Sequence, residues 1–111
     1  MNERLHRIGR NEAVFREVNE RIEQVTESLH ATSEVLGILC ECGDDSCTAQ
    51  INVSVAEYER VRSDSALFFV CPGHEIPDVE DVVEHHDEYD VVRKKPGEAE
   101  EVAEALDRRE N

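Results

Sequence analysis

The feature that most constrains this chain is the stretch LCECGDDSCTAQI, residues 39–51, which holds three cysteines within eight residues. They form a C-x-C-x4-C pattern at Cys40, Cys42 and Cys47, and Cys71 is the only other cysteine. Structural zinc sites take four ligands in a tetrahedron, and thiolates and imidazoles are the usual donors. The cluster therefore predicts a metal site to which one tight loop supplies three of the four ligands.

A second short stretch, CPGH, offers two candidates for the fourth ligand. Cys71 ends an apolar run, where a thiol can pack as a small hydrophobic side chain. His74 follows the Pro-Gly turn, from which its side chain can project outward. The predicted ligands are Cys40, Cys42, Cys47 and His74. Cys71 is the alternative to His74 as the fourth ligand.

The expected ion is Zn²⁺, and an iron–sulfur cluster is the less favoured alternative, because three cysteines and a histidine can also hold a [2Fe–2S] centre. A structural role is favoured over a catalytic one, since four or five protein ligands can close the coordination shell that catalytic zinc leaves open. The chain has no G-x-S-x-G, Walker or HExxH motif. His85 and His86 could form a second site, but we interpret them as the C-terminal end of a helix.

The charge of the chain limits the class of partner. Its 111 residues carry 27 acidic and 12 basic side chains, a formal net charge of -15. Nucleic-acid binders need a basic face, so direct binding to nucleic acid is not expected. A protein partner with a basic surface fits this charge better, although a solvated acidic surface also keeps a protein in solution.

Targeting signals are missing from the sequence. The first ten residues, MNERLHRIGR, contain no apolar segment typical of a signal peptide, and no stretch reaches the ~20 apolar residues that cross a bilayer. We therefore expect a cytoplasmic protein with no membrane partner. Clustered thiols in that reducing compartment hold metal more often than they form disulfides.

The residue pattern predicts a single α+β domain over 1–111, stapled by the zinc site. A long N-terminal helix is expected, followed by a small antiparallel sheet of about three strands with short helices. The short apolar run EVLGIL leads into the cysteines, and strands are expected at 48–55, 65–70 and 89–95. Short helices are expected at 55–63, where Ser54 and Glu57 form a capping-box pattern, and at 76–86, where Pro77 lies in the first turn. The expected organisation is residues 1–9 frayed at Gly9, the long helix at 10–30, the zinc-stapled core at 36–95, and a C-terminal helix or tail at 97–111.

The N-terminal helix carries an apolar heptad stripe, with Asn11 at its one polar position. Two readings of this stripe stay open. We favour a helix packed across its own domain, and the alternative is a homodimer formed through the helix. The apolar stripe consists of Ile8, Phe15, Val18, Ile22, Val25 and Leu29.

Two resemblances bear on the site. The C-x-C-x4-C spacing is similar to the post-SET zinc motif over these eight residues alone. Nearly the whole chain, from RNEAVFREVNERIE through FFVCPGHE to KKPGEAEEVAE, resembles a family of short uncharacterised bacterial proteins. That resemblance implies that the three clustered cysteines and the P-G-H-E turn belong together, with Cys71 as an extra thiol, and it implies no activity.

These observations favour a small, non-enzymatic zinc-binding protein that acts as a protein-interaction or regulatory module. A zinc-thiolate redox switch, with Cys71 as a nearby spare thiol, is the alternative function. A metalloenzyme is the least favoured of the three.

Overall fold

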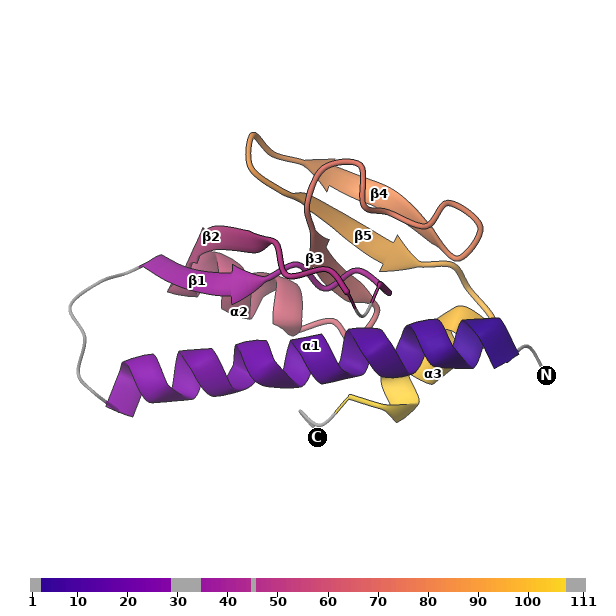
Figure 1. Cartoon of the computed structure of the whole chain (residues 1–111), viewed down its shortest axis with the longest axis horizontal. Helices are drawn as coiled ribbons and strands as arrows, with labels where there is room; N and C mark the ends of the chain where they lie inside the picture. The colour runs from indigo at the N-terminus through magenta and orange to yellow at the C-terminus, as the bar shows by residue number, and fades with distance from the viewer. Residues whose placement is uncertain (1–2, 29–34, 45, 108–111) are drawn as a thin grey trace.

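The computed structural model describes residues 3–28, 35–44 and 46–107, and side chains are described in α1 only up to residue 25. Helix α1 (Glu3–Ser28) lies along one side of the molecule, and β1 (Val35–Leu39) and α3 (Glu98–Ala105) pack against it (Figure 1). The other elements, in chain order, are β1 (Val35–Leu39), β2 (Gln50–Ser54), α2 (Val55–Arg62), β3 (Leu67–Val70), β4 (Glu80–His85), β5 (Asp90–Lys94) and α3 (Glu98–Ala105).

The strands form two antiparallel sheets. The predicted α+β fold with a long N-terminal helix and a small antiparallel sheet of three strands is confirmed, and a second sheet of two strands is added to it. One sheet is the β1–β2 hairpin, in which Leu36 pairs with Val53 and Ile38 with Ile51. The other has the order β3-β5-β4. The hairpin was not predicted as a sheet, because VLGIL was recognised only as an apolar run before the cysteines.

The apolar core lies where the two sheets and α2 meet. Its largest side chains, each less than 2% exposed, include Tyr58 from α2 and Phe69 from β3, whose rings stack with centroids 5.8 Å apart. Ser54 caps α2, because its hydroxyl accepts a hydrogen bond of 3.0 Å from the Glu57 backbone N–H, as the capping-box pattern predicts. The core thus fixes α2 and β3 beside the hairpin whose loop carries the cysteines.

The helix predicted at 76–86 is wrong, because residues Glu80–His85 form strand β4. The helix-start signal at Pro77 produces only a turn, in which the N–H groups of Val79 and Glu80 both donate to the Ile76 carbonyl. The following β-branched pair, Val82 and Val83, favours extended backbone. Val82 pairs with Val92 of β5, and the backbone hydrogen bonds of this ladder outweigh the local helix signal. His85 and His86 consequently lie at the end of a strand.

Helix α1 begins at Glu3 rather than at Arg10, so the fraying expected over residues 1–9 is not observed from Glu3 onward. Gly9 lies inside the helix for a packing reason. A Cβ built on Gly9 would lie 2.4 Å from Cγ1 of Val102, so the missing side chain lets α3 approach closely. Residues 1 and 2, and Leu29 of the predicted stripe, lie outside the described residues.

The face that α1 turns toward the domain is largely polar, which differs from the favoured prediction. Leu5 and Ile8 are buried at its N-terminal end, but Val18 and Val25 of the predicted stripe are 40% and 48% exposed. Phe15 and Ile22 are half-buried. The remaining buried side chains of this face are Glu12, Arg16, Asn19 and Glu23.

Specific hydrogen bonds explain how such a polar face can be buried. Lys94 of β5 donates to Glu12 at 2.5 Å and to Glu80 at 2.6 Å, and all three side chains are at most 3% exposed. Arg16 donates to the carbonyls of Ser65 and Ala103, and its guanidinium lies 4.0 Å from the centre of the Phe68 ring. Buried polar groups are tolerated when they are paired in this way.

Candidate metal centre

The loop between β1 and β2 positions the three clustered cysteines. The Cys40 N–H donates to the Ala49 carbonyl at 2.9 Å, which continues the hairpin pairing past Leu39. Farther along, Asp44 builds a tight turn: its carboxylate accepts hydrogen bonds from the Ser46 N–H and hydroxyl, and its carbonyl accepts one from the Cys47 N–H. This turn brings the chain back, so that Cys47 returns toward Cys40.

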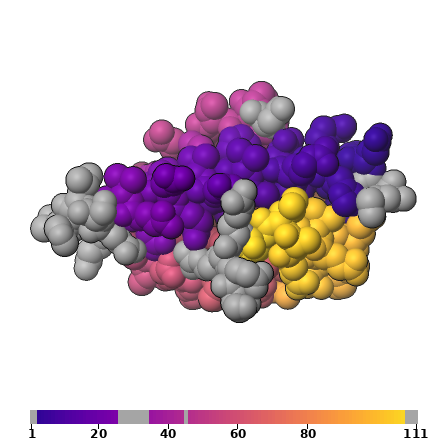
Figure 2. All heavy atoms as spheres, turned by 90° about the horizontal axis from the view of Figure 1, so that it is seen from below, coloured from indigo at the N-terminus to yellow at the C-terminus, as the bar shows by residue number. Residues whose placement is uncertain are grey.

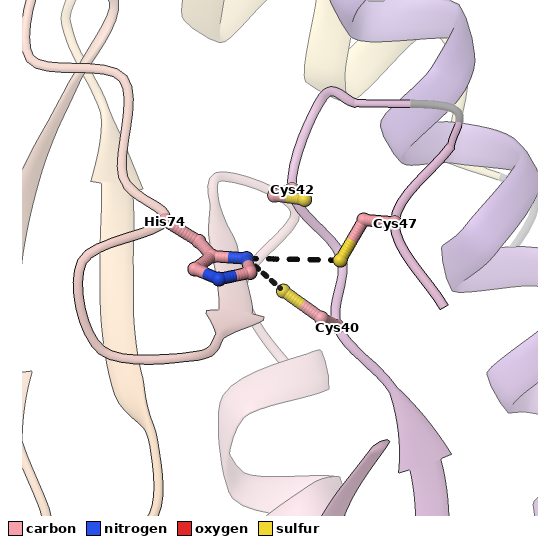
Figure 3. A group of neighbouring side chains, drawn as sticks. All are labelled: Cys40, Cys42, Cys47 and His74. Atoms are coloured by element: carbon pink, nitrogen blue, oxygen red, sulfur yellow. Dashed lines mark hydrogen bonds between the residues drawn. The ribbon is translucent and has the colours of Figure 1, made fainter. Parts of the chain in front are cut away.

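The CPGH turn positions the histidine. Gly73 has φ +87°, a left-handed conformation that glycine adopts without strain, and the His74 N–H closes the turn on the Cys71 carbonyl at 2.9 Å. As predicted, the His74 side chain projects from the strand end, and Figure 3 shows its ring pointing toward the cysteine sulfurs.

The structure brings the four predicted residues together. Their four donor atoms, three Sγ and one ring nitrogen, all lie within 4.8 Å of one another. The distance from His74 Nδ1 is 3.6 Å both to Cys40 Sγ and to Cys47 Sγ. A tetrahedral ion with metal–sulfur and metal–nitrogen bonds of about 2.3 and 2.05 Å would hold sulfur and nitrogen about 3.6 Å apart. The observed separations therefore fit four ligands of one ion.

Burial differs across the cluster. Cys40 and Cys42 are buried, Cys47 is half-buried and His74 is exposed. Burial is the main reason why the pKa values of the Cys40 and Cys42 thiols are raised, since a thiolate there loses its hydration. A bound cation would offset this penalty, because its charge favours the deprotonated sulfur that coordinates it.

Cys71, the alternative fourth ligand, is not in this cluster. Its backbone takes part instead, because the Cys71 N–H points at Cys40 Sγ with a nitrogen–sulfur distance of 3.2 Å. An amide directed at a ligand sulfur orients it and stabilises its negative charge. Of the two candidates in this turn, His74 is therefore the one whose side chain lies with the three clustered cysteines.

Three residues that support the loop were not predicted to do so. Glu41 lies between two of the cysteines, but its fully buried carboxylate is directed into the core, where it accepts hydrogen bonds from the Phe69 N–H and from the Asn19 amide. Asn19 also exchanges two hydrogen bonds with the Leu39 backbone, of 2.8 and 2.9 Å. Asn11 donates to the Gly43 carbonyl at 3.0 Å.

Gly43 serves close packing rather than a sharp turn. Among the residues that the structure describes, the glycines with positive φ are Gly73 and Gly97. A Cβ on Gly43 would lie 2.6 Å from Cγ2 of Ile8. The missing side chain thus lets α1 pack directly on the cysteine loop.

A second group of metal-binding residue types lies near the β4–β5 turn, where Glu57, Glu84 and His86 converge. Arg60 already occupies the position of a cation in this group. Its guanidinium donates two hydrogen bonds to each glutamate, at 2.6–2.9 Å. Both carboxylates are therefore already bound to an internal cation, and the group makes a poor site for a metal ion.

Comparisons with protein-family models, with curated proteins and with solved structures found no match to this chain. The resemblance to short bacterial proteins therefore stays a prediction. In the part of the chain that the structure describes, no helix is long and apolar enough to span a membrane.

Proposed function

We propose that Cys40, Cys42, Cys47 and His74 bind one zinc ion in a structural site, and that the chain is a non-enzymatic protein-interaction module. The observation that carries the proposal is the mutual distance of at most 4.8 Å among four soft donors from two distant turns. Zinc is favoured because thiolate and imidazole ligands in a tetrahedron are its preferred set. A [2Fe–2S] centre divides its ligands between two irons, which would spread the donor atoms more widely.

The site would act as a cross-link between two distant parts of the chain. Cys40 in the loop and His74 in the CPGH turn are 34 residues apart in the sequence, and an ion bound to both would close the intervening chain into a ring. A small domain with a limited core gains stability from such a closure. With four protein ligands on the ion, no position is left for the water molecule that a catalytic zinc activates.

Metal content measured on single variants tests this assignment. The purified protein should hold one zinc ion per chain, and Cys40→Ser or His74→Ala should lose most of it at a fixed concentration of competing chelator. Cys71→Ser is the matched control, because its thiol lies outside the cluster, and it should keep the full zinc content. Zinc retained by Cys40→Ser and His74→Ala but lost by Cys71→Ser would overturn the ligand assignment.

The charge distribution supports an unidentified protein partner with a basic surface. Helix α1 contains six glutamates and five arginines, a net charge of -1, whereas the whole chain carries -15. Most of the negative charge therefore lies outside α1, where it would attract a basic surface. Affinity capture at low and high ionic strength would detect such a partner, which should be released by salt.

A zinc-thiolate redox switch is the second candidate, and the closeness of Cys71 to Cys40 favours it. Hydrogen peroxide would oxidise two thiolates to one disulfide and, with two protons taken from water, would itself be reduced to two molecules of water, while zinc would be released. Zinc release by peroxide with formation of a disulfide that includes Cys71 would support this function. A disulfide that still forms at the same rate in Cys71→Ser would exclude this role for Cys71.

A further inference from the structure

The described surface of α1 carries an apolar stripe that points away from the domain. The exposed fractions of Val14, Val18 and Val25 are 58%, 40% and 48%, and the half-buried Ile22 borders them. Together with Glu17 and Arg21 they line a shallow groove of about 640 Å³. Figure 2 shows α1 running across this face of the molecule, with α3 beside its N-terminal half.

This stripe is the reverse of what a helix on the surface of a monomer should show. Such a helix turns its apolar face to the core and its charged face to water. In α1 the buried positions Glu12, Arg16 and Asn19 are polar, while valines face outward. Each of these three side chains makes a hydrogen bond to a partner within the domain, so this polar face of the helix belongs against the domain. Contiguous exposed apolar side chains mark surfaces that bind another protein.

The charges along the stripe favour a second copy of this chain over a basic partner. Helix α1 has a net charge of only -1, so two copies can bring their helices together with little repulsion despite the charge of -15 on each chain. Because α1 is nearly neutral, it would not attract a basic partner to this face. The opposed helices would also bring apolar side chains of one copy against those of the other.

The positions of Glu17 and Arg21 define the relative direction of the two helices. With 3.6 residues per turn, both side chains lie on the same edge of the stripe, one turn apart. A two-fold axis that relates antiparallel helices brings an edge against the same edge of the partner. Glu17 of each copy would then meet Arg21 of the other, which gives two such pairs in the interface. In a parallel pair this edge would face the opposite edge, which carries Ile22. The reciprocal pairing favours the antiparallel arrangement.

We propose that the chain forms an antiparallel homodimer through the apolar stripe of α1, with its two-fold axis between Val18 and Arg21. Val14 of one copy then lies against Val25 of the other. The proposal deepens the interaction role above by naming a partner, but it does not require the zinc assignment to be correct. The stripe from Val14 to Val25 is about 17 Å long at 1.5 Å per residue. Such an interface is small, so we expect a micromolar, concentration-dependent equilibrium.

Sedimentation equilibrium of the full chain over a wide concentration range tests the stripe. The wild-type protein should dimerise, and Val18→Glu should weaken the dimer by at least about tenfold, because it would bury a carboxylate at the centre of the interface. Val83→Glu is the matched control, because Val83 is an exposed valine like Val18 (48% against 40%) but lies on β4. This variant should dimerise as the wild type does. Zinc content should be the same in all three proteins, which separates this test from that of the metal site.

Charge reversal tests the direction of the helices. Glu17→Arg and Arg21→Glu should each weaken the homodimer by about tenfold, because each creates two like-charge contacts across the axis. An equimolar mixture of the two variants should restore dimerisation. In the mixed dimer the two substituted side chains, which now carry opposite charges, meet each other, and the native Arg21 of one chain meets the native Glu17 of the other. Each variant keeps its altered helix in the mixture, so recovery can come only from contacts between chains.

Any of three results would overturn the proposal. The wild-type chain could stay monomeric up to millimolar concentration, or Val18→Glu could dimerise as the wild type does. The third result is a mixture of Glu17→Arg and Arg21→Glu that dimerises no more tightly than either variant alone.

Discussion

The buried cluster of Glu12, Glu80 and Lys94 leads to a prediction about pH. One ammonium group can neutralise only one of the two carboxylates that it contacts. Glu80 accepts a further hydrogen bond of 2.9 Å from the Ile76 N–H, whereas Glu12 Oε1 is buried without a hydrogen-bond partner in the structure. Burial, together with repulsion from Glu80, outweighs the attraction of Lys94 and raises the pKa of Glu12 from 4.5 to about 8.

The sign of the effect follows from where the proton is held. Between about pH 4.5 and 8 the folded protein keeps a proton on Glu12 that the unfolded chain releases. The stability contributed by Glu12 is therefore fully present below pH 4.5 and is lost as the pH rises through 8. Each unit of pKa difference corresponds to about 1.4 kcal/mol, so the loss approaches about 5 kcal/mol above pH 8.

The variant Glu12→Gln isolates this contribution. Glutamine has the shape of the protonated acid and can still accept a hydrogen bond from Lys94, but it does not titrate. We expect its free energy of unfolding to be similar to that of the wild type near pH 5 and to exceed it by several kcal/mol near pH 8. Urea unfolding in saturating zinc at each pH measures both proteins, and taking the difference cancels the pH dependence of the thiols.

The exposed Glu88→Gln serves as a matched control for the same chemical change at a solvated position. A stability difference between Glu12→Gln and the wild type that does not vary with pH would contradict a raised pKa of Glu12. A difference that moves in favour of the wild type as the pH rises would show that Glu12 is ionised in the folded protein and paired with Lys94.

Two further predictions concern packing and metal. Gly9→Ala should lower the free energy of unfolding by about 1–3 kcal/mol, although alanine is the better helix former, because its Cβ would collide with Val102; Val102→Ala should recover most of the loss. Removal of zinc by a chelator should increase hydrogen exchange at residues 40–44, 46–49 and 71–74 before it does so in β5, and uniform exchange throughout would contradict a local staple.

Short sequence patterns predicted those features of the fold and the site that depend on neighbouring residues. The C-x-C-x4-C spacing and the CPGH turn located the candidate ligands, and Ser54 with Glu57 located the start of α2. Each of these patterns works over a few residues, so the sequence contains the whole of the signal.

The predictions were wrong where contacts between residues far apart in the sequence determine the local structure. β4 has a helix-start signal at Pro77, and only its pairing with β5 makes it a strand. The outward direction of the α1 valines could not be foreseen, because it depends on partners for Glu12 and Arg16 that lie on β5, on α3 and before β3. A heptad stripe shows which side chains lie together on a helix, but it does not show whether they face the domain or another molecule.

Asn19 connects α1 to the metal loop, and its replacement tests that connection. Its amide donates to the Leu39 carbonyl and to the Glu41 carboxylate, and its oxygen accepts from the Leu39 N–H. Asn19→Ala removes all three hydrogen bonds and leaves the buried Glu41 with one donor fewer, so we expect a loss of about 2–4 kcal/mol in stability.

Because these hydrogen bonds hold the backbone on either side of Cys40, the same variant should bind zinc about 10–100-fold more weakly, although Asn19 contacts no ligand atom. Chelator competition measures this affinity, and Asn11→Ala, which removes one hydrogen bond farther along the loop, should have the smaller effect. Unchanged zinc affinity in Asn19→Ala would show that the loop holds its geometry without the helix. A large loss would show instead that α1, whose outer face we assign to a second copy, also shapes the metal site with its inner face.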